Sequence, residues 1–212
     1  MYSATYNGNG SFSEPTPISE INTKWNDGPA VVTADGNTMY FASESFVSGE
    51  FEKEKGSTQR TGLIYLFRAV KENGKWGSIK PVPFNGKTWS TGNPTVSKDG
   101  KTLYFASNRK GSLGGSTDIW KVEVKGNNTY GEPVNLGKKI NTEGNENFPY
   151  ITDDNKLYFA SDGHKGFGGY DVFVADLSKE EEPLNIGAPI NTEKDDFSFS
   201  FNNDKNIGFF AS

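Results

Sequence analysis

Short runs of alternating apolar and polar residues, separated by clusters of Gly, Asn and Asp, extend along the whole chain. In one of them, residues 94–97 alternate, residues 98–101 contain an Asp-Gly turn, and residues 102–106 are β-branched and aromatic. Asp-Gly suits a tight turn because Gly tolerates positive φ and Asp can bond to its own backbone. This segment therefore predicts a β-hairpin. No window of a dozen residues has a convincing helical period, so the chain is predicted to be almost wholly β.

The second strand of this hairpin belongs to a phrase that the chain repeats. An aromatic-Phe-Ala-Ser run follows an Asp-containing turn four times. The spacing of the copies is close to the roughly 40 to 50 residues of a four-stranded propeller blade. The aromatic pair alternates across each strand, so the two rings are expected to face different neighbouring sheets and to form the core between blades. The pairs are Tyr40 and Phe41, Tyr104 and Phe105, Tyr158 and Phe159, and Phe209 and Phe210.

Further strands and a connector repeat with the same period. Residues 64–70, 118–124 and 171–177 are predicted third strands, which residues 1–6 also match, and residues 132–136 are a predicted fourth strand. An Ile-Asn-Thr connector then leads to the next blade, with its Asn at positions 22, 141 and 191. We expect Asn141 and Asn191 to be structural residues, because the polar pair can tie one blade to the next through side-chain-to-backbone hydrogen bonds.

The predicted fold is therefore an all-β propeller of four-stranded antiparallel blades, forming one domain over residues 1–212. The repeats cover approximately residues 25–88, 89–142 and 143–194, with residues 1–24 and 195–212 forming a fourth. The chain is thus expected to begin and end in the middle of a blade. Either the N-terminal strands close a ring of four blades, or the repeats belong to a larger ring and leave an unpaired edge after Ser212. The larger ring is favoured, because four-fold rings are uncommon.

Composition and charge exclude several classes of protein. The 212 residues include 25 Gly, 10 Pro and 14% aromatic residues, as in a turn-dense chain with enough large side chains for one core. No stretch approaches the ~18 apolar residues of a membrane span. The net charge is −5 and the basic residues are scattered, which argues against nucleic-acid binding. The absence of Cys excludes disulfides and thiolate chemistry.

Four segments carry a resemblance to a known family: residues 157–173, the connectors at 135–137 and 190–192, and residues 195–199. They resemble the TolB-type, WD40-like propeller repeats of Bacteroidetes OmpA-family envelope proteins, the PorE-like group. In that family the propeller precedes a carboxypeptidase-regulatory-like domain and a C-terminal OmpA-like peptidoglycan-binding domain. The first repeat departs from the pattern, because Ser43-Glu44-Ser45 replaces the Ser-Asn-Arg form and residues 46–62 replace the double-Gly loop.

The resemblance implies a periplasmic, outer-membrane-associated scaffold linked to type IX secretion, with envelope proteins as partners. It implies neither catalysis nor direct insertion into the membrane. Peptidoglycan would be bound only through an OmpA-like domain, of which no segment is present in these 212 residues. The N-terminus lacks the pattern of a signal peptide, so a periplasmic location would require that the targeting segment has been removed.

The residues themselves also argue against an enzyme. A hydrolase triad needs a base that is held by a carboxylate and faces a nucleophile, and the only His is His164, in a Gly-rich loop beside Asp162 and Asp171. We expect local hydrogen bonds there rather than catalysis. The Gly-rich segments 111–115 and 166–169 precede strands, whereas a phosphate cradle precedes a helix. No cofactor is therefore expected.

Acidic residues give no clear metal site. The pairs Asp153-Asp154 and Asp195-Asp196 and the segment 143–146 lack the spacing of a calcium loop, so turn and rim solvation is the expected role. Asp118 and Asp171 occupy the same position at the head of a third strand. We expect them to bond to loop amides, or to pair with a basic side chain of the preceding loop: Arg109 for Asp118, and His164 or Lys165 for Asp171.

Two classes of function remain. The first is an interaction platform formed by the loops between second and third strands, whose candidate contact residues are Arg109, Lys110, His164, Lys165, Phe167 and Tyr170. The second is a carbohydrate- or peptide-binding propeller, from a surface glycan-utilisation system or a hydrolase, that uses the mouth of the central channel. A ligand site of that kind predicts Trp or Tyr and carboxylates converging from several blades, whereas a platform predicts a shallow polar surface.

Overall fold

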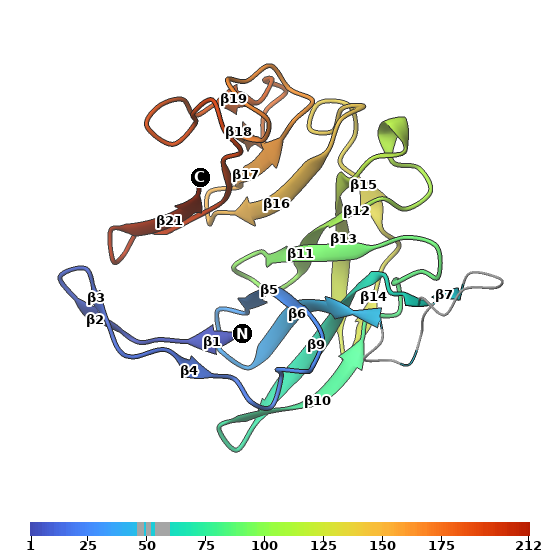
Figure 1. The fold of residues 1–212 in the computed structure, drawn as a ribbon, viewed down its shortest axis with the longest axis vertical. Coiled ribbons are helices and arrows are strands. Elements are labelled where there is room, and N and C mark those ends of the chain that lie inside the picture. Colours follow the sequence, from blue (N-terminus) through green and yellow to red (C-terminus); the bar gives the residue numbers. More distant parts are fainter. Residues whose placement is uncertain (46–48, 50–51, 54–59) are drawn as a thin grey trace.

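The computed structural model describes residues 1–45, 49, 52–53 and 60–212, and it is a β-propeller arc of antiparallel sheets (Figure 1). The single-turn 3-10 helix η2 (Leu113–Gly115) interrupts one loop. Among the described residues, no helix has the length and apolar character that crossing a membrane requires. The all-β prediction is confirmed. Most of the insertion predicted at residues 46–62 lies outside the described residues.

Three blades are complete. In each blade the strands follow one another in chain order, from the innermost strand to the outermost. Blade one also has a short strand pair in the loop between its second and third strands, and the outermost position of blade two is divided between two short strands. Blade one consists of β5 (Asp27–Val32), β6 (Thr38–Glu44), β9 (Ile64–Glu72) and β10 (Lys75–Pro81), with β7 (Glu52–Lys53) and β8 (Arg60–Thr61) between β6 and β9. Blade two consists of β11 (Thr91–Val96), β12 (Thr102–Ser107), β13 (Asp118–Gly126), β14 (Thr129–Tyr130) and β15 (Val134–Asn135). Blade three consists of β16 (Glu146–Ile151), β17 (Lys156–Ser161), β18 (Asp171–Asp176) and β19 (Leu184–Asn185).

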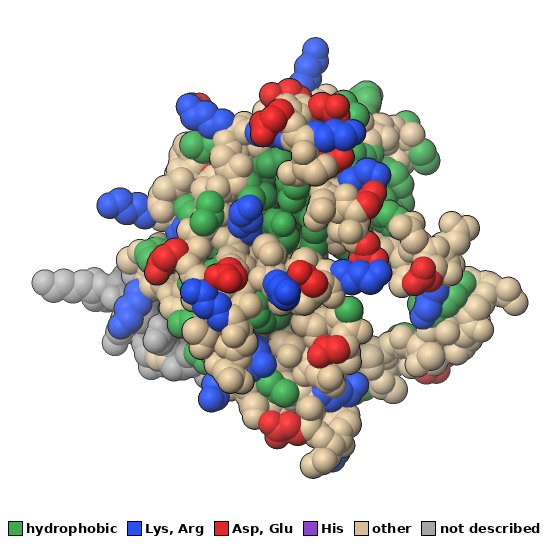
Figure 2. Space-filling model, turned by 180° about the vertical axis from the view of Figure 1, so that it is seen from behind, with side chains coloured by type: hydrophobic (Ala, Val, Ile, Leu, Met, Phe, Trp, Pro, Cys, Tyr) green, Lys and Arg blue, Asp and Glu red, His purple; other side chains and the backbone are tan. Residues whose placement is uncertain are grey.

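Two hairpins flank these blades. The half-blade is the pair β20 (Phe197–Asn202) and β21 (Ile207–Ala211), and the N-terminal hairpin contains β1 (Tyr2–Ser3), β2 (Tyr6–Gly8), β3 (Ser11–Phe12) and β4 (Thr16–Pro17). Within the described residues, no backbone pairing joins the two hairpins. Figure 2 shows an opening beside the N-terminal hairpin. The repeat boundaries and the choice between a four-blade ring and a larger ring remain predictions.

The aromatic pairs of the second strands mostly form the core between blades, as predicted. Tyr40 of blade one packs with Phe105 and Trp120 of blade two, and Tyr104 packs with Phe159 and Phe173 of blade three. The prediction is wrong for the half-blade, where Phe209 is 54% exposed and Phe210 is 44% exposed. Among the described residues no third strand pairs with β21, so these two rings lack the cover that the third strand gives in the complete blades.

An Asn in each connector clamps the third strand of the blade that the chain is leaving. Its Nδ2 donates to the carbonyl, and its Oδ1 accepts from the backbone nitrogen, of a single residue; this residue lies in a strand in three cases, and in the fourth it is Met1, whose donor is the terminal ammonium. The prediction of side-chain-to-backbone ties is confirmed, with Nδ2-to-carbonyl distances of 2.7 to 3.0 Å. The clamped pairs are Asn22 with Met1, Asn85 with Leu66, Asn141 with Ile119, and Asn191 with Val172. Asn85 was missed, because its connector reads Phe84-Asn85-Gly86 rather than Ile-Asn-Thr.

The Thr that follows the clamping Asn joins the connector to the first strand of the next blade. Thr142 donates from its N–H and its hydroxyl to Glu146 at the start of β16, both at 2.7 Å. Ser161, the last residue of the repeated phrase, donates to the same carboxylate at 2.6 Å. Thr192 and Asp196 repeat the Thr-to-acid contact in the next connector. The Ser at the end of the repeated phrase therefore binds the same carboxylate that accepts the hydrogen bonds of the connector Thr.

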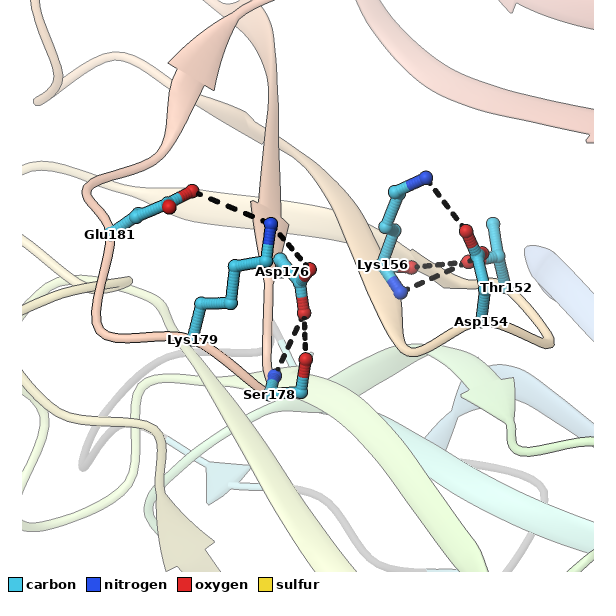
Figure 3. Close-up of polar contacts among 7 residues, drawn as sticks. All are labelled: Thr152, Asp154, Lys156, Asp176, Ser178, Lys179 and Glu181. Atoms are coloured by element: carbon cyan, nitrogen blue, oxygen red, sulfur yellow. Dashed lines mark hydrogen bonds and ion pairs between the residues drawn. The ribbon is translucent and has the colours of Figure 1, made fainter.

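The turns between first and second strands share an acid-centred hydrogen bond. Thr152 donates its hydroxyl to Asp154 at 2.6 Å, and Lys156 forms an ion pair with that carboxylate at 2.7 Å (Figure 3). Figure 3 also shows Asp176, which receives the N–H and hydroxyl of Ser178 in the turn after β18. The hydroxyls of Thr33 and Ser97 donate to Asp35 and Asp99 in the same way. These two hydrogen bonds are the largest causes of the lowered pKa of Asp35 and of Asp99.

The Ser97→Ala variant tests this turn chemistry. The Ser97 hydroxyl is the largest cause of the lowered pKa of Asp99, followed by the N–H of Lys101. A lowered folded-state pKa stabilises the fold above the ordinary Asp value and loses that contribution as the pH falls through the folded value. We expect the pKa of Asp99 to rise towards 3.8 in the variant. An NMR titration of the carboxyl carbons measures it with Asp35 as internal reference, and an unmoved Asp99 would contradict the assignment.

The Asn141→Ala variant tests the clamp. It leaves the N–H and the carbonyl of Ile119, a fully buried residue, without their side-chain partner. Each unsatisfied buried group costs roughly 1 to 3 kcal/mol, so the free energy of unfolding should fall by about 2 to 4 kcal/mol. Urea unfolding measures it, with Asn203→Ala in an exposed turn as the control. Equal stability of the two variants would argue against the clamp.

Candidate interaction face and central channel

The loops between second and third strands lie against the connectors that enter the next blade. Ser116 donates to the carbonyl of Glu143 at 3.2 Å, and Thr117 donates its N–H to Asn145 at 3.3 Å. Gly114 has φ of +60°, and a Cβ there would lie 2.5 Å from the carbonyl oxygen of Glu143. Gly114 therefore permits the close approach of the loop backbone to the connector backbone. We call residues 108–117, 137–145, 162–170 and 187–196 together the loop face.

Arg109 lies inside this face rather than on it. The residue is only 7% exposed, and its guanidinium donates to Ser107, Thr91 and the carbonyl of Phe84 at 3.1 to 3.2 Å. The rings of Phe84, Trp89, Phe105 and Trp120 lie within 4.8 to 5.8 Å of it. Burial lowers the pKa of Arg109 to about 10. The prediction that Arg109 contacts a partner is wrong, because its side chain is enclosed within blade two and its connector.

His164 occupies in blade three the position that Arg109 occupies in blade two. Its Nε2 lies 2.9 Å from the carbonyl oxygen of Ile140, and its ring packs on Phe159 and Phe173. Phe84 and Ile140 are the residues directly before the clamping asparagines, so Arg109 and His164 both reach the same carbonyl of the connector. His164 is half-buried in this position. The side chain therefore joins a loop to a distant connector, rather than making the local hydrogen bonds with Asp or Lys that were predicted.

Asp118 and Asp171 bind loop amides, which was the first of the two predicted arrangements. Asp171 accepts from the N–H groups of Phe167 and Gly168 at 2.8 and 3.0 Å, and Asp118 accepts from Leu113 at 3.0 Å. The alternative pairing with Arg109 or with His164 or Lys165 is wrong, because no ion pair joins them among the described residues. Burial raises the pKa of Asp118, although hydrogen bonds from Asn135 and Leu113 act in the opposite direction.

Phe167 is the most exposed aromatic side chain of the loop face, at 62%. Its backbone is nevertheless fixed, because its N–H and that of the next residue both donate to the buried Asp171. Lys110 and Lys165 are also exposed, whereas Tyr170 is half-buried and its N–H donates to Asp195 at 2.9 Å. Of the six predicted contact residues, the structure thus exposes Lys110, Lys165 and Phe167.

The acidic residues serve the turns and connectors. Asp195 and Asp196 accept from loop and connector groups, Asp153 pairs with Lys98, and Glu146 accepts from Thr142 and Ser161. Within the part of the chain that the structure describes, no three His, Cys, Asp or Glu side chains form a group that could hold a metal ion.

The innermost strands β5, β11, β16 and β20 line one cavity of about 270 Å³, the central channel. The lining is formed by prolines, small residues and the aromatic residues Phe148, Tyr150 and Phe199. Pro94 and Pro149 follow residues with positive φ, where the pairing register shifts, so each sits at a bulge of an edge strand. The described lining residues include neither Trp nor a carboxylate. The channel therefore lacks the carboxylates that the predicted ligand site requires.

Comparison with solved structures identifies the fold class. A TolB protein from Agrobacterium tumefaciens superposes with a TM-score of 0.53 at 16% identity, over 92% of this chain and 61% of that one. A puromycin-hydrolyzing peptidase of Mycobacterium tuberculosis superposes with a TM-score of 0.50 at 14% identity, over 79% of this chain and 23% of that one. No protein-family model matches the sequence, and a search of the curated proteins finds no match.

These likenesses show that the fold is a β-propeller similar to that of the TolB protein. At this level of identity they extend to the fold alone. The chain spans about three fifths of the Agrobacterium protein and about a quarter of the peptidase.

The Arg109→Ala variant tests whether Arg109 is structural. It removes three hydrogen bonds and leaves a cavity among four rings, so the free energy of unfolding should fall by about 3 kcal/mol. Lys110→Ala, at the next and exposed position, should change it by less than about 0.5 kcal/mol. Thermal and urea unfolding measure both. Similar values for the two variants would mean that the Arg109 contacts add nothing to the fold.

Proposed function

We propose that this chain is a non-catalytic protein-interaction module of the bacterial cell envelope. In this proposal the protein is periplasmic and associated with the outer membrane, as a propeller of the PorE-like OmpA family linked to type IX secretion. The resemblance of residues 157–173 and of the connectors to that family supports the location, and the TolB-like fold supports the role of an interaction propeller. The proposed docking surface is the loop face.

The observation that carries this proposal is the presentation of Phe167. An exposed aromatic ring on a mobile loop loses entropy when it is bound, whereas a ring on an ordered loop loses less. The two N–H bonds to Asp171 hold the backbone of the Phe167 loop before any partner arrives. Aromatic anchors of this kind dominate the energy of protein interfaces. The exposed Lys165 beside it favours a partner surface with acidic groups.

A second candidate function uses the central channel. An apolar channel with Phe148, Tyr150 and Phe199 in its lining suits an apolar peptide segment better than a carbohydrate. The likeness to a peptidase extends only over the propeller arc and supports a peptide ligand weakly. The loop face is preferred because its aromatic side chain is exposed and its backbone is held.

The Phe167→Ser variant tests the loop face. The unmodified domain and two variants are used to retain proteins from an envelope extract, and the retained proteins are identified by mass spectrometry. The control is Leu184→Ser, because Leu184 is 67% exposed in the outermost strand of the same blade. We expect the unmodified domain and the control to retain the same outer-membrane secretion proteins. Loss of one central aromatic contact of at least about 2 kcal/mol should reduce their retention more than tenfold in Phe167→Ser.

Two outcomes would contradict the proposal. One is equal retention by Phe167→Ser and the control. The other is saturable oligosaccharide binding by the domain with no protein retained. A third variant, Phe199→Ala, tests the channel: loss of retention in this variant but not in Phe167→Ser would instead favour the channel.

A further inference from the structure

The half-blade and the N-terminal hairpin both present strand edges without a partner. Within the described residues β21 pairs only with β20, and β1 pairs only with β4. Phe210 is 44% exposed and Tyr2 is 69% exposed. In blades two and three the aromatic residues at the corresponding positions, Phe105 with Trp120 and Phe159 with Phe173, pair across the second and third strands and are buried.

The connector clamp indicates the register in which the N-terminal hairpin would pair with β21, because each clamped residue of a complete blade lies opposite the Ala of the repeated phrase. Asn141 clamps Ile119, which pairs with Ala106 of the second strand, and Asn191 clamps Val172, which pairs with Ala160. The clamped residue of blade one, Leu66, likewise pairs with Ala42.

Asn22 clamps Met1 in the same way. Met1 is therefore the equivalent of these clamped third-strand residues, and the Ala of the repeated phrase in β21 is Ala211. The same register brings Tyr2 opposite Phe210 and Thr5 opposite Ile207.

Side chains of the two hairpins already meet. The rings of Phe12 and Phe209 lie 5.8 Å apart, and the Lys205 ammonium lies 5.7 Å from the ring of Tyr6. The innermost strands of all three blades and of the half-blade line one channel, so the arc curves far enough for its two ends to approach each other. Figure 1 shows β21 and the N-terminal hairpin on the same side of the arc.

In place of the larger ring that the sequence favoured, we propose that the N-terminal hairpin closes on β21 of the same chain, as the third and fourth strands of the blade that β20 and β21 begin. Closure pairs Met1 with Ala211 and Thr5 with Ile207. It satisfies the open backbone edge of β21 and brings Phe210 against Tyr2, as Phe105 is brought against Trp120. The inference is independent of the loop face and its partner.

A pair of engineered cysteines tests the register, because the chain has no Cys of its own. Directly opposite residues have Cβ atoms about 4.5 to 5.5 Å apart, within reach of a disulfide after small shifts, whereas diagonal neighbours at about 7 to 8 Å are too distant. The test variant is Thr5→Cys with Ile207→Cys, which leaves Phe12 and Phe209 intact. The control, Asn7→Cys with Ile207→Cys, is displaced by two residues along the same strand direction.

We expect mild oxidation to cross-link the test variant within one chain at least about tenfold faster than the control, as seen by mobility on a non-reducing gel and by mass. Cross-linking between two chains would overturn the proposal in favour of exchange of hairpins between copies. Equal rates for the two variants would overturn it as well.

A measurement on the unmodified protein guards against a variant that fails to fold. Closure predicts that the amides of β21 resist hydrogen exchange as well as those of the paired strand β17, whereas exchange at the rate of an open edge would overturn the proposal.

Discussion

The connector asparagine is the contact on which the rest of this propeller depends. Each blade is a small sheet that cannot bury both of its faces alone, so its position relative to the next blade must be fixed. The amides of Asn85, Asn141 and Asn191 fix it by binding the N–H and the carbonyl of a single third-strand residue. A connector held in this way starts the next innermost strand at a set place, and the aromatic rings of the second strands then meet.

The junction beside the clamp differs between blades, and that difference explains the polar residues of the loops. In blade three Glu146 accepts from Thr142 and Ser161, and His164 reaches the connector carbonyl. In blade two Thr91 replaces the acid, and the guanidinium of Arg109 binds both its hydroxyl and the connector carbonyl. Arg109 and His164, which were predicted to contact a partner, therefore stabilise the connectors instead. The surface available to a partner is therefore smaller than the six predicted residues would provide, and its most exposed aromatic side chain is Phe167.

The strand order and most of the core could be predicted, because period-two runs and the aromatic-Phe-Ala-Ser phrase report directly on which residues are buried. The burial of Arg109 could not, since a charged residue beside Gly and Lys reads as a loop surface until the four rings around it are known. Asn85 was missed because its role depends on position relative to Leu66 rather than on a motif. The exposure of Phe209 and Phe210 could not be predicted either, because burial depends on a neighbouring strand and not on the residues themselves.

The most direct test of this account is hydrogen exchange at the clamped amides of Leu66, Ile119 and Val172. If the asparagine contacts hold the blades together, these three amides exchange only when the whole propeller unfolds, at the rates of the central amides of β12 and β17. If they exchange orders of magnitude faster than those central amides, the connectors open locally while the blades stay folded. That result would contradict the clamp as the interaction that organises the fold.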